Sequence, residues 1–256
     1  MRTRQILHLA WAGFLQLVRT RVYLNILVAG IAMVAAALAF DQLSASEGGR
    51  VLFDVGTAFT ALIVVTLAGV VSITAVTREI ESKIANLVLS RPLGRVEYVL
   101  GRFATTAALV LLANAALGLL LAGLLWSVGA KHAGLAMGVV LFGSLEGFVI
   151  AAIAVFFGVG SSSTMSAVFT ATLFVLGRLS GELLLLIERG KFGSFAPVMK
   201  GIYAVLPHLT AFDLTPLAHG ASTSALDLGQ RAAYGLCYAA AFLAAAAYRF
   251  SRRDLL

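Results

Sequence analysis

The sequence is poor in charge. Of its 256 residues, 12% are Asp, Glu, Lys or Arg and 60% are hydrophobic, whereas soluble domains are about 25% charged and about 45–50% apolar. So few charges cannot cover a fold of this length with a polar surface. The apolar runs are continuous, which excludes the alternating strands of a membrane barrel and leaves helices. We therefore expect an all-α integral membrane protein.

Cysteine and proline are also scarce. The single cysteine, Cys237, lies within an apolar run; it excludes an intramolecular disulfide and indicates no metal site. Three of the four prolines lie within the segment 188–228. The net charge is +7, but the basic residues stand at the ends of apolar runs instead of forming a dense patch, which argues against nucleic acid as a partner.

The sequence lacks the residues of an ATPase or a protease. It contains no G-x-x-x-x-G-K-[ST] loop; Gly190-Lys191 is the nearest fragment and lacks the upstream glycine. The four histidines lie outside the apolar runs, so none could serve as the base for a serine nucleophile inside the membrane. His208, Asp213 and His219 could together bind a metal, but loop histidines without tight spacing are usually solvated. We expect no catalytic, cofactor-binding or metal site in this chain, which is therefore not an enzyme by itself.

Long hydrophobic runs are what the sequence has in abundance. A membrane-spanning helix needs about 20 apolar residues, and six stretches reach that length, so residues 1–256 are predicted to form one domain with six transmembrane helices. The predicted spans are about 22–40, 55–76, 103–126, 135–159, 164–187 and 229–248.

The basic residues predict the orientation of the chain. With six spans, both termini lie on the same side of the membrane. Twelve of the 19 basic residues fall on that side and six on the other, while Arg178 lies within a span. Because basic residues concentrate in cytoplasmic loops, both termini are predicted to be cytoplasmic.

Two segments outside the spans are also predicted to be helical. In 1–21, polar residues recur every three or four positions and apolar residues cover the rest, as in a helix that lies flat at the cytoplasmic interface. The alternative is that this segment extends the first span, although Arg19 and Arg21 would be costly to bury. The external segment 188–228 keeps apolar runs too short to span, which predict short helices at the outer interface before the last span.

The cytoplasmic stretch 78–91, between spans two and three, has a pattern of its own. Apolar residues recur on one helical face, and Glu79 and Lys83 are spaced for an i,i+4 ion pair. Proline at position 92 and glycine at position 94 then end the helix. The pattern predicts a short amphipathic helix under the membrane on which a partner docks. The residues expected to contact that partner are Glu79, Glu81, Lys83, Ile84, Leu87 and Arg91.

At this point the chain resembles the permease subunits of type-2 ABC exporters, and the resemblance covers its whole length. After their second span those proteins carry an acidic start, a run like Leu-Val-Leu-Ser-Arg-Pro, a small residue with Arg and an acidic residue, and then Gly with a basic residue. The corresponding pieces here are Arg78-Glu79, 87–92, Arg95-Val96-Glu97 and Gly101-Arg102. The chain departs in two minor ways: the last basic residue is more often Lys in the family, and a glycine often stands near position 83. The match also includes Arg19-Thr20-Arg21, the serine turn 161–163, Leu206-Pro207 and the tail 252–255.

The resemblance implies partners and a mechanism. It implies that two permease copies or homologues form a dimer with two cytoplasmic ATP-binding subunits, which hold ATP and Mg, and that 78–91 is the coupling helix. It also implies export and a place in the bilayer of the bacterial cytoplasmic (inner) membrane. The few polar residues in the spans favour a lipid-linked, amphipathic or hydrophobic substrate. The alternatives are a membrane scaffold or assembly factor, which would not need a coupling helix, and a secondary transporter, which would more often show inverted repeats.

Three ionisable residues, Glu146, Arg178 and Glu182, lie within apolar runs, where such groups need partners. The short turn 161–163 predicts that spans four and five form an antiparallel hairpin. Glu146 lies sixteen residues before the middle of this turn and Arg178 sixteen after it, so each is about 24 Å away at 1.5 Å per residue. The two could therefore pair, with Glu182 as a second partner. The alternatives are that Arg178 and Glu182 reach water at the outer interface, or that these charges contact the substrate.

Overall fold

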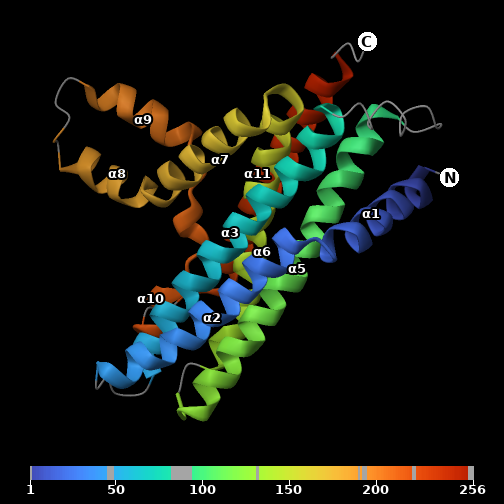
Figure 1. The fold of residues 1–256 in the computed structure, drawn as a ribbon. Helices are drawn as coiled ribbons and strands as arrows, with labels where there is room; N and C mark the ends of the chain where they lie inside the picture. Colours follow the sequence, from blue (N-terminus) through green and yellow to red (C-terminus); the bar gives the residue numbers. More distant parts are fainter. Residues whose placement is uncertain are drawn as a thin grey trace.

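The computed structural model describes residues 2–44, 49–81, 94–130, 133–189, 191, 195–220 and 223–252, and no residue in these ranges lies in a strand. The chain is a bundle of long helices with a bent arm at one side (Figure 1). The elements in chain order are α1 (Arg2–Val18), α2 (Arg21–Leu43), α3 (Arg50–Glu81), α5 (Arg95–Ser127), η2 (Ala133–Leu135), α6 (Ala136–Gly160), α7 (Ser163–Arg178), α8 (Ser180–Glu188), α9 (Ala196–Val205), η4 (Leu209–Phe212), α10 (Thr215–Ala218) and α11 (Ala225–Ser251).

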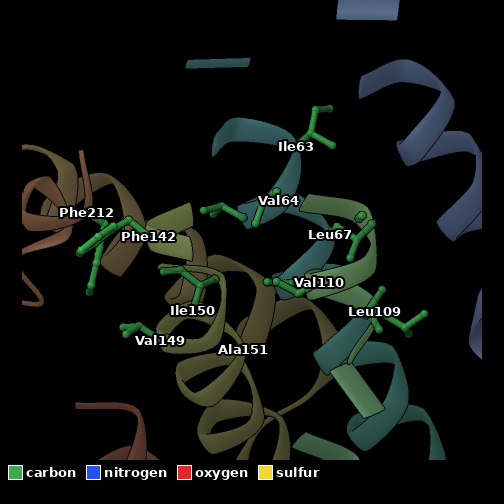
Figure 2. Packing of buried hydrophobic residues seen from close by; sticks show 14 of the residues in the cluster. Ile63, Val64, Leu67, Leu109, Val110, Phe142, Val149, Ile150, Ala151 and Phe212 are labelled. Atoms are coloured by element: carbon green, nitrogen blue, oxygen red, sulfur yellow. The ribbon is translucent and has the colours of Figure 1, made fainter. Parts of the chain in front are cut away.

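Helix α6 forms the centre of the bundle. In the most apolar 18-residue stretch of α6, 67% is buried inside the bundle, against 22% in the corresponding stretch of α2 at the periphery. Helix α6 packs against α3, α5, α7 and α11. Figure 2 shows Ile150 of α6 near Val110 of α5 and Val64 of α3, while Val149 lies on another side of α6. Lipid tails do not drive such helices together, so their association depends on close packing between side chains.

A glycine at the centre of α6 allows this close packing. A Cβ atom at Gly147 would lie 2.5 Å from Val110 Cγ1 of α5 and 3.0 Å from Val64 Cγ1 of α3. Small residues at such crossings let helix backbones approach one another. The three central helices therefore meet at Gly147.

Within the described residues, four helices are long and apolar enough to cross a membrane, namely α2, α3, α5 and α6. The pair α7 and α8 would make a fifth span, bent by 49° at the break between them. The helix within the predicted span 164–187 is thus broken after Arg178. The last helix, α11, is long enough to cross a membrane at 27 residues. It is less apolar than these helices, because Arg231 and several tyrosines lower its hydropathy.

The N-terminal helix α1 is separate from α2. The chain turns at Thr20, whose backbone is extended and whose hydroxyl oxygen accepts a hydrogen bond from Tyr23 N, so that it caps α2. The alternative that segment 1–21 extends the first span is therefore wrong. Helix α1 instead contacts α5, where Thr105 Oγ1 donates a hydrogen bond to the Ala10 carbonyl at 3.2 Å.

The segment before α11 contains three short helical pieces, α9, η4 and α10. In Figure 1 α8 and α9 extend away from the bundle, while α10 lies back against α3. Short helices were predicted in this segment before the last span, and the structure contains them.

Candidate functional site

Two polar clusters lie within the bundle, and the first joins α3 to α5. Glu79, near the end of α3, forms an ion pair with Arg102 of α5, with Oε1 and Nη2 2.5 Å apart. The Tyr98 hydroxyl donates a hydrogen bond to Glu79 Oε2 at 2.8 Å. The Arg102 and Glu79 side chains are only 7% and 15% exposed. This cluster, Glu79–Tyr98–Arg102, therefore fixes the two helix ends on either side of residues 82–93.

Helices α1 and α11 also reach this end of the bundle. A Cβ atom at Gly13 of α1 would lie 2.9 Å from Arg102 Nη1, so α1 packs directly against the arginine. The Tyr98 ring stacks on Phe250 of α11 with centroids 5.4 Å apart, and Arg95 Nη1 donates to the Ser251 carbonyl at 2.7 Å. Side-chain contacts therefore join α1, α3, α5 and α11 at this end of the bundle.

The expected partner-contacting residues are placed only in part. Helix α3 continues without a break to Glu81, so positions 78–81 belong to α3. The carboxylate of Glu79 pairs with Arg102 inside the bundle, and its expected contact with a partner stays a prediction. The Glu81 side chain and Lys83, Ile84, Leu87 and Arg91 lie outside the described residues.

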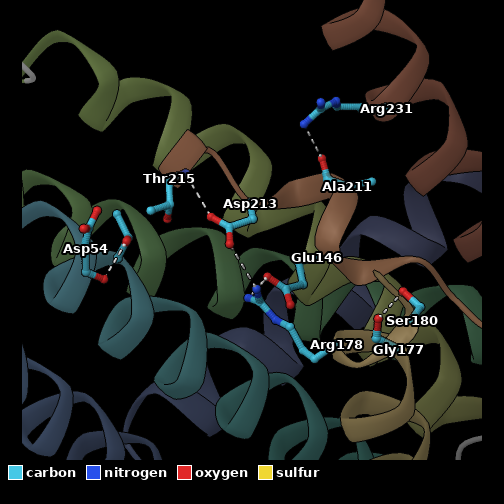
Figure 3. Close-up of polar contacts among 10 residues, drawn as sticks. Asp54, Glu146, Gly177, Arg178, Ser180, Ala211, Asp213, Thr215 and Arg231 are labelled. Atoms are coloured by element: carbon cyan, nitrogen blue, oxygen red, sulfur yellow. Dashed lines mark hydrogen bonds and ion pairs between the residues drawn. The ribbon is translucent and has the colours of Figure 1, made fainter. Parts of the chain in front are cut away.

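The second cluster lies within the bundle and contains Glu146 of α6, Arg178 at the end of α7, and Asp213 after η4 (Figure 3). Arg178 Nη2 donates to Glu146 Oε2 at 2.9 Å, and Arg178 Nη1 lies 3.9 Å from Asp213 Oδ2. Glu146 is ten residues from the start of α6 and fourteen from its end, or about 15 and 21 Å along the axis. The predicted Glu146–Arg178 pair is present, deep within the bundle.

The bend after α7 brings Asp213 to this pair. At the bend, Ser180 Oγ donates to the Gly177 carbonyl at 2.7 Å. A Cβ atom at Gly177 would lie 2.6 Å from the Pro207 carbonyl oxygen, so only glycine lets residues 207–209 pass against the end of α7. Asp213 follows a few residues later. Glu182, expected as the second partner of Arg178, lies beyond the bend on α8, is exposed and forms no ion pair with it.

A cavity of about 310 Å³ opens beside the second cluster, lined by α3, α6, α7 and the segment from η4 to α10. Glu146, Arg178 and Asp213 line it together with apolar side chains that include Phe174 and Phe212. Glu146 Oε1 is buried and has no hydrogen-bond partner among the described residues. The cavity therefore contains an unsatisfied acceptor within a mostly apolar wall.

A second acidic position lies near the cavity. Asp54, one helical turn before Thr57 of the cavity wall, has its Oδ2 atom 3.0 Å from His219 Nε2. This contact joins α3 to the end of α10. This contact could not be predicted from the sequence, because 165 residues separate the two side chains along the chain. No group of three or more His, Cys, Asp or Glu within the described ranges is placed to hold a metal ion.

These features define a multi-pass helical membrane protein with charged groups inside the bundle. At one end of the bundle, side-chain contacts join the helices to one another. A family model for the ABC-2 family transporter proteins matches residues 7–255. The chain belongs to that family and is an ABC transporter membrane protein. No curated protein matches the chain.

Proposed function

We propose that this chain is the permease subunit of an ATP-driven exporter and that residues 78–91 couple it to a separate ATPase. The observation that carries the proposal is the Glu79–Tyr98–Arg102 cluster. It holds both helix ends that flank residues 82–93. A displacement of that segment by a partner would therefore be transmitted to α3 and α5 and, through Gly13 and Phe250, to α1 and α11.

The same proposal includes the assembly and its orientation. Two ATP-binding subunits, which bind ATP and Mg, act on a dimer of this chain or of this chain with a homologue. Six spans cross the bacterial inner membrane with both termini in the cytoplasm; α7–α8 is the broken fifth span and α11 the sixth. Helix α1 lies at the cytoplasmic interface, and the short helices before α11 lie at the outer one.

The proposed substrate is lipid-linked, amphipathic or hydrophobic. The buried face of α6 from Val149 to Val155 is entirely apolar, so a strongly hydrated solute has no polar track along the bundle centre. Three charged groups gather instead at the cavity beside Glu146. An amphipathic molecule suits that combination of apolar surface and a few charges.

The test reverses one charge in the cluster. Glu79→Lys places two cations side by side in a largely buried site, where a like-charge contact is costly. We expect it to lower ATP hydrolysis by the purified complex at least tenfold while the protein still inserts in the membrane. The charge swap Glu79→Arg with Arg102→Glu should restore part of the activity. The matched control is Glu188→Lys, which changes an exposed glutamate at the far end of α8.

Co-purification from the native membrane distinguishes this function from a scaffold. A transporter subunit retains an ATPase, and the Glu79→Lys variant should lower either its recovery or its activity. If no ATPase accompanies the wild-type protein, or if Glu79→Lys leaves both recovery and hydrolysis at the wild-type level, the coupling function is wrong.

A further inference from the structure

We propose that the cavity between α3, α6, α7 and the η4–α10 segment binds the ammonium headgroup of an amphiphilic substrate, with Glu146 as its hydrogen-bond acceptor. This inference rests on the proposed transport function and names its substrate class.

The charges that line the cavity favour a cation. Glu146 and Asp213 contribute two carboxylates, and Arg178 contributes one guanidinium group, which already contacts both of them. With all three ionised, one negative charge is left uncompensated. An anionic headgroup would meet the two carboxylates at short range, whereas an ammonium group would complete the neutralisation that ionised groups within a membrane require.

The hydrogen bonds lead to the same conclusion. Glu146 is 2% exposed. Its Oε2 atom accepts a hydrogen bond from Arg178, whereas its Oε1 atom has no partner in the described structure. Buried polar atoms are nearly always hydrogen-bonded, so Oε1 requires a donor. Asp213 Oδ1 accepts from Thr215 N at 2.9 Å, while its Oδ2 atom, 3.9 Å from Arg178, is too far away for a hydrogen bond with it. A primary ammonium group has three N–H donors and no acceptor, which suits a site whose unsatisfied atoms are carboxylate oxygens.

The lining of the cavity fits an organic cation better than a metal ion. Calcium takes six to eight oxygen ligands and magnesium demands octahedral oxygens, but the cavity offers two carboxylates that Arg178 already contacts. The rest of its lining comes from three threonines and from apolar side chains such as Leu62, Phe174 and Phe212. About 310 Å³ accommodates an ammonium group and a short apolar segment, while a longer chain would extend out of the cavity.

The charged groups of the cavity differ in exposure. The exposed fraction of the side chain falls from 41% for Asp213 and 28% for Arg178 to 3% for Glu146. A cation that enters from the side of Asp213 would therefore meet a partly exposed carboxylate first and the buried carboxylate of Glu146 last.

The test measures binding of three dansyl probes to the purified complex in uncharged maltoside micelles. Dansylcadaverine carries a primary ammonium group, dansylglycine a carboxylate and dansylamide no charge. We expect saturable fluorescence enhancement with the ammonium probe alone. Glu146→Gln should weaken that binding at least tenfold and Asp213→Asn by a smaller factor. Glu182→Gln, which removes an exposed carboxylate beyond the bend, should bind as the wild type does.

A steric variant keeps the test decisive if Glu146→Gln does not fold. Ala61→Phe fills the cavity from α3 and leaves every charge in place, so it should abolish saturable binding. Wild-type affinity in either folded variant, or tighter binding of dansylglycine than of dansylcadaverine, would overturn the proposal. ATPase recovery is measured in the same samples, so loss of coupling is seen separately from loss of binding.

The ammonium group could come from a membrane lipid or from a dissolved amphiphile. Adding phosphatidylethanolamine to the micelles separates these sources. Displacement of the bound ammonium probe assigns the cavity to a lipid headgroup, and retention of the probe assigns it to a free cationic amphiphile. Both results support an ammonium site.

Discussion

At the scale of single residues, Arg178 is the one cation among the charged groups of the cavity, and the two carboxylates beside it depend on it unequally. Glu146 is buried and receives its only described hydrogen bond from Arg178, whereas Asp213 is partly exposed and also accepts from Thr215 N. Removing one partner of a buried pair costs about 3–5 kcal/mol when both are fully desolvated. The exposure of Arg178 reduces that cost here.

We therefore predict that Arg178→Gln destabilises the protein more than Glu146→Gln. Arg178→Gln leaves two carboxylates without a cation, while Glu146→Gln leaves Arg178 with Asp213. The expected losses are about 2–3 and about 1–2 kcal/mol, seen as an ordered fall in melting temperature in detergent. The double variant should be more stable than the sum of the two changes predicts. Simple additivity would mean that the two side chains are not coupled.

The Glu146–Arg178 pair could be predicted from the sequence because each residue lies the same number of residues from the turn 161–163, and helical rise converts that count into depth. The third member of this cluster, Asp213, could not be predicted from the sequence. Asp213 comes from an irregular segment, and it reaches Arg178 only because Gly177 packs against the Pro207 carbonyl. That contact is tertiary, and the continuous apolar run across the bend contains no local signal for it.

At the scale of elements, the close approach of α3, α5 and α6 at Gly147 gives a second prediction. Gly147→Ala places a methyl group against Val110 and Val64 in a packed interior, where overpacking costs about 1–3 kcal/mol. We expect a lower melting temperature and partial recovery with Val110→Ala. Gly123→Ala is the matched control, because a Cβ atom there meets nothing within 4 Å. Equal melting temperatures for Gly147→Ala and Gly123→Ala would contradict this packing.

Element lengths were harder to predict than element types. The apolar runs correctly predicted helices, but the predicted span 55–76 did not show that α3 extends to Glu81 or that Glu79 is held there by Arg102 and Tyr98 of α5. Periodicity in segment 78–91 could not reveal that Glu79 faces inward, since its partners lie 19 and 23 positions further along the chain. A charged residue at a helix end is compatible with either a solvent contact or a buried pair until the neighbouring helix is placed.

At the scale of the whole molecule, the proposed topology predicts which positions a membrane-impermeant thiol reagent reaches. In a Cys237→Ser background, single cysteines at Ser46 and Ser194 should react from outside intact cells. Cysteines at Ser90 and Ser251 should react only after the membrane is opened. Reaction of either cytoplasmic position from outside would exclude six spans with internal termini.

The short length of α7 has a consequence for the bilayer around it. Its 16 residues extend about 24 Å at 1.5 Å per residue, whereas the hydrocarbon core is about 30 Å thick. In the proposed topology α8 must therefore cover the remaining thickness, at an angle of 49° to α7. The lipids next to α8 would pack against an oblique helix instead of an upright one. An amphiphile that moves between the bilayer and the protein at this point would leave a less regularly packed part of the membrane.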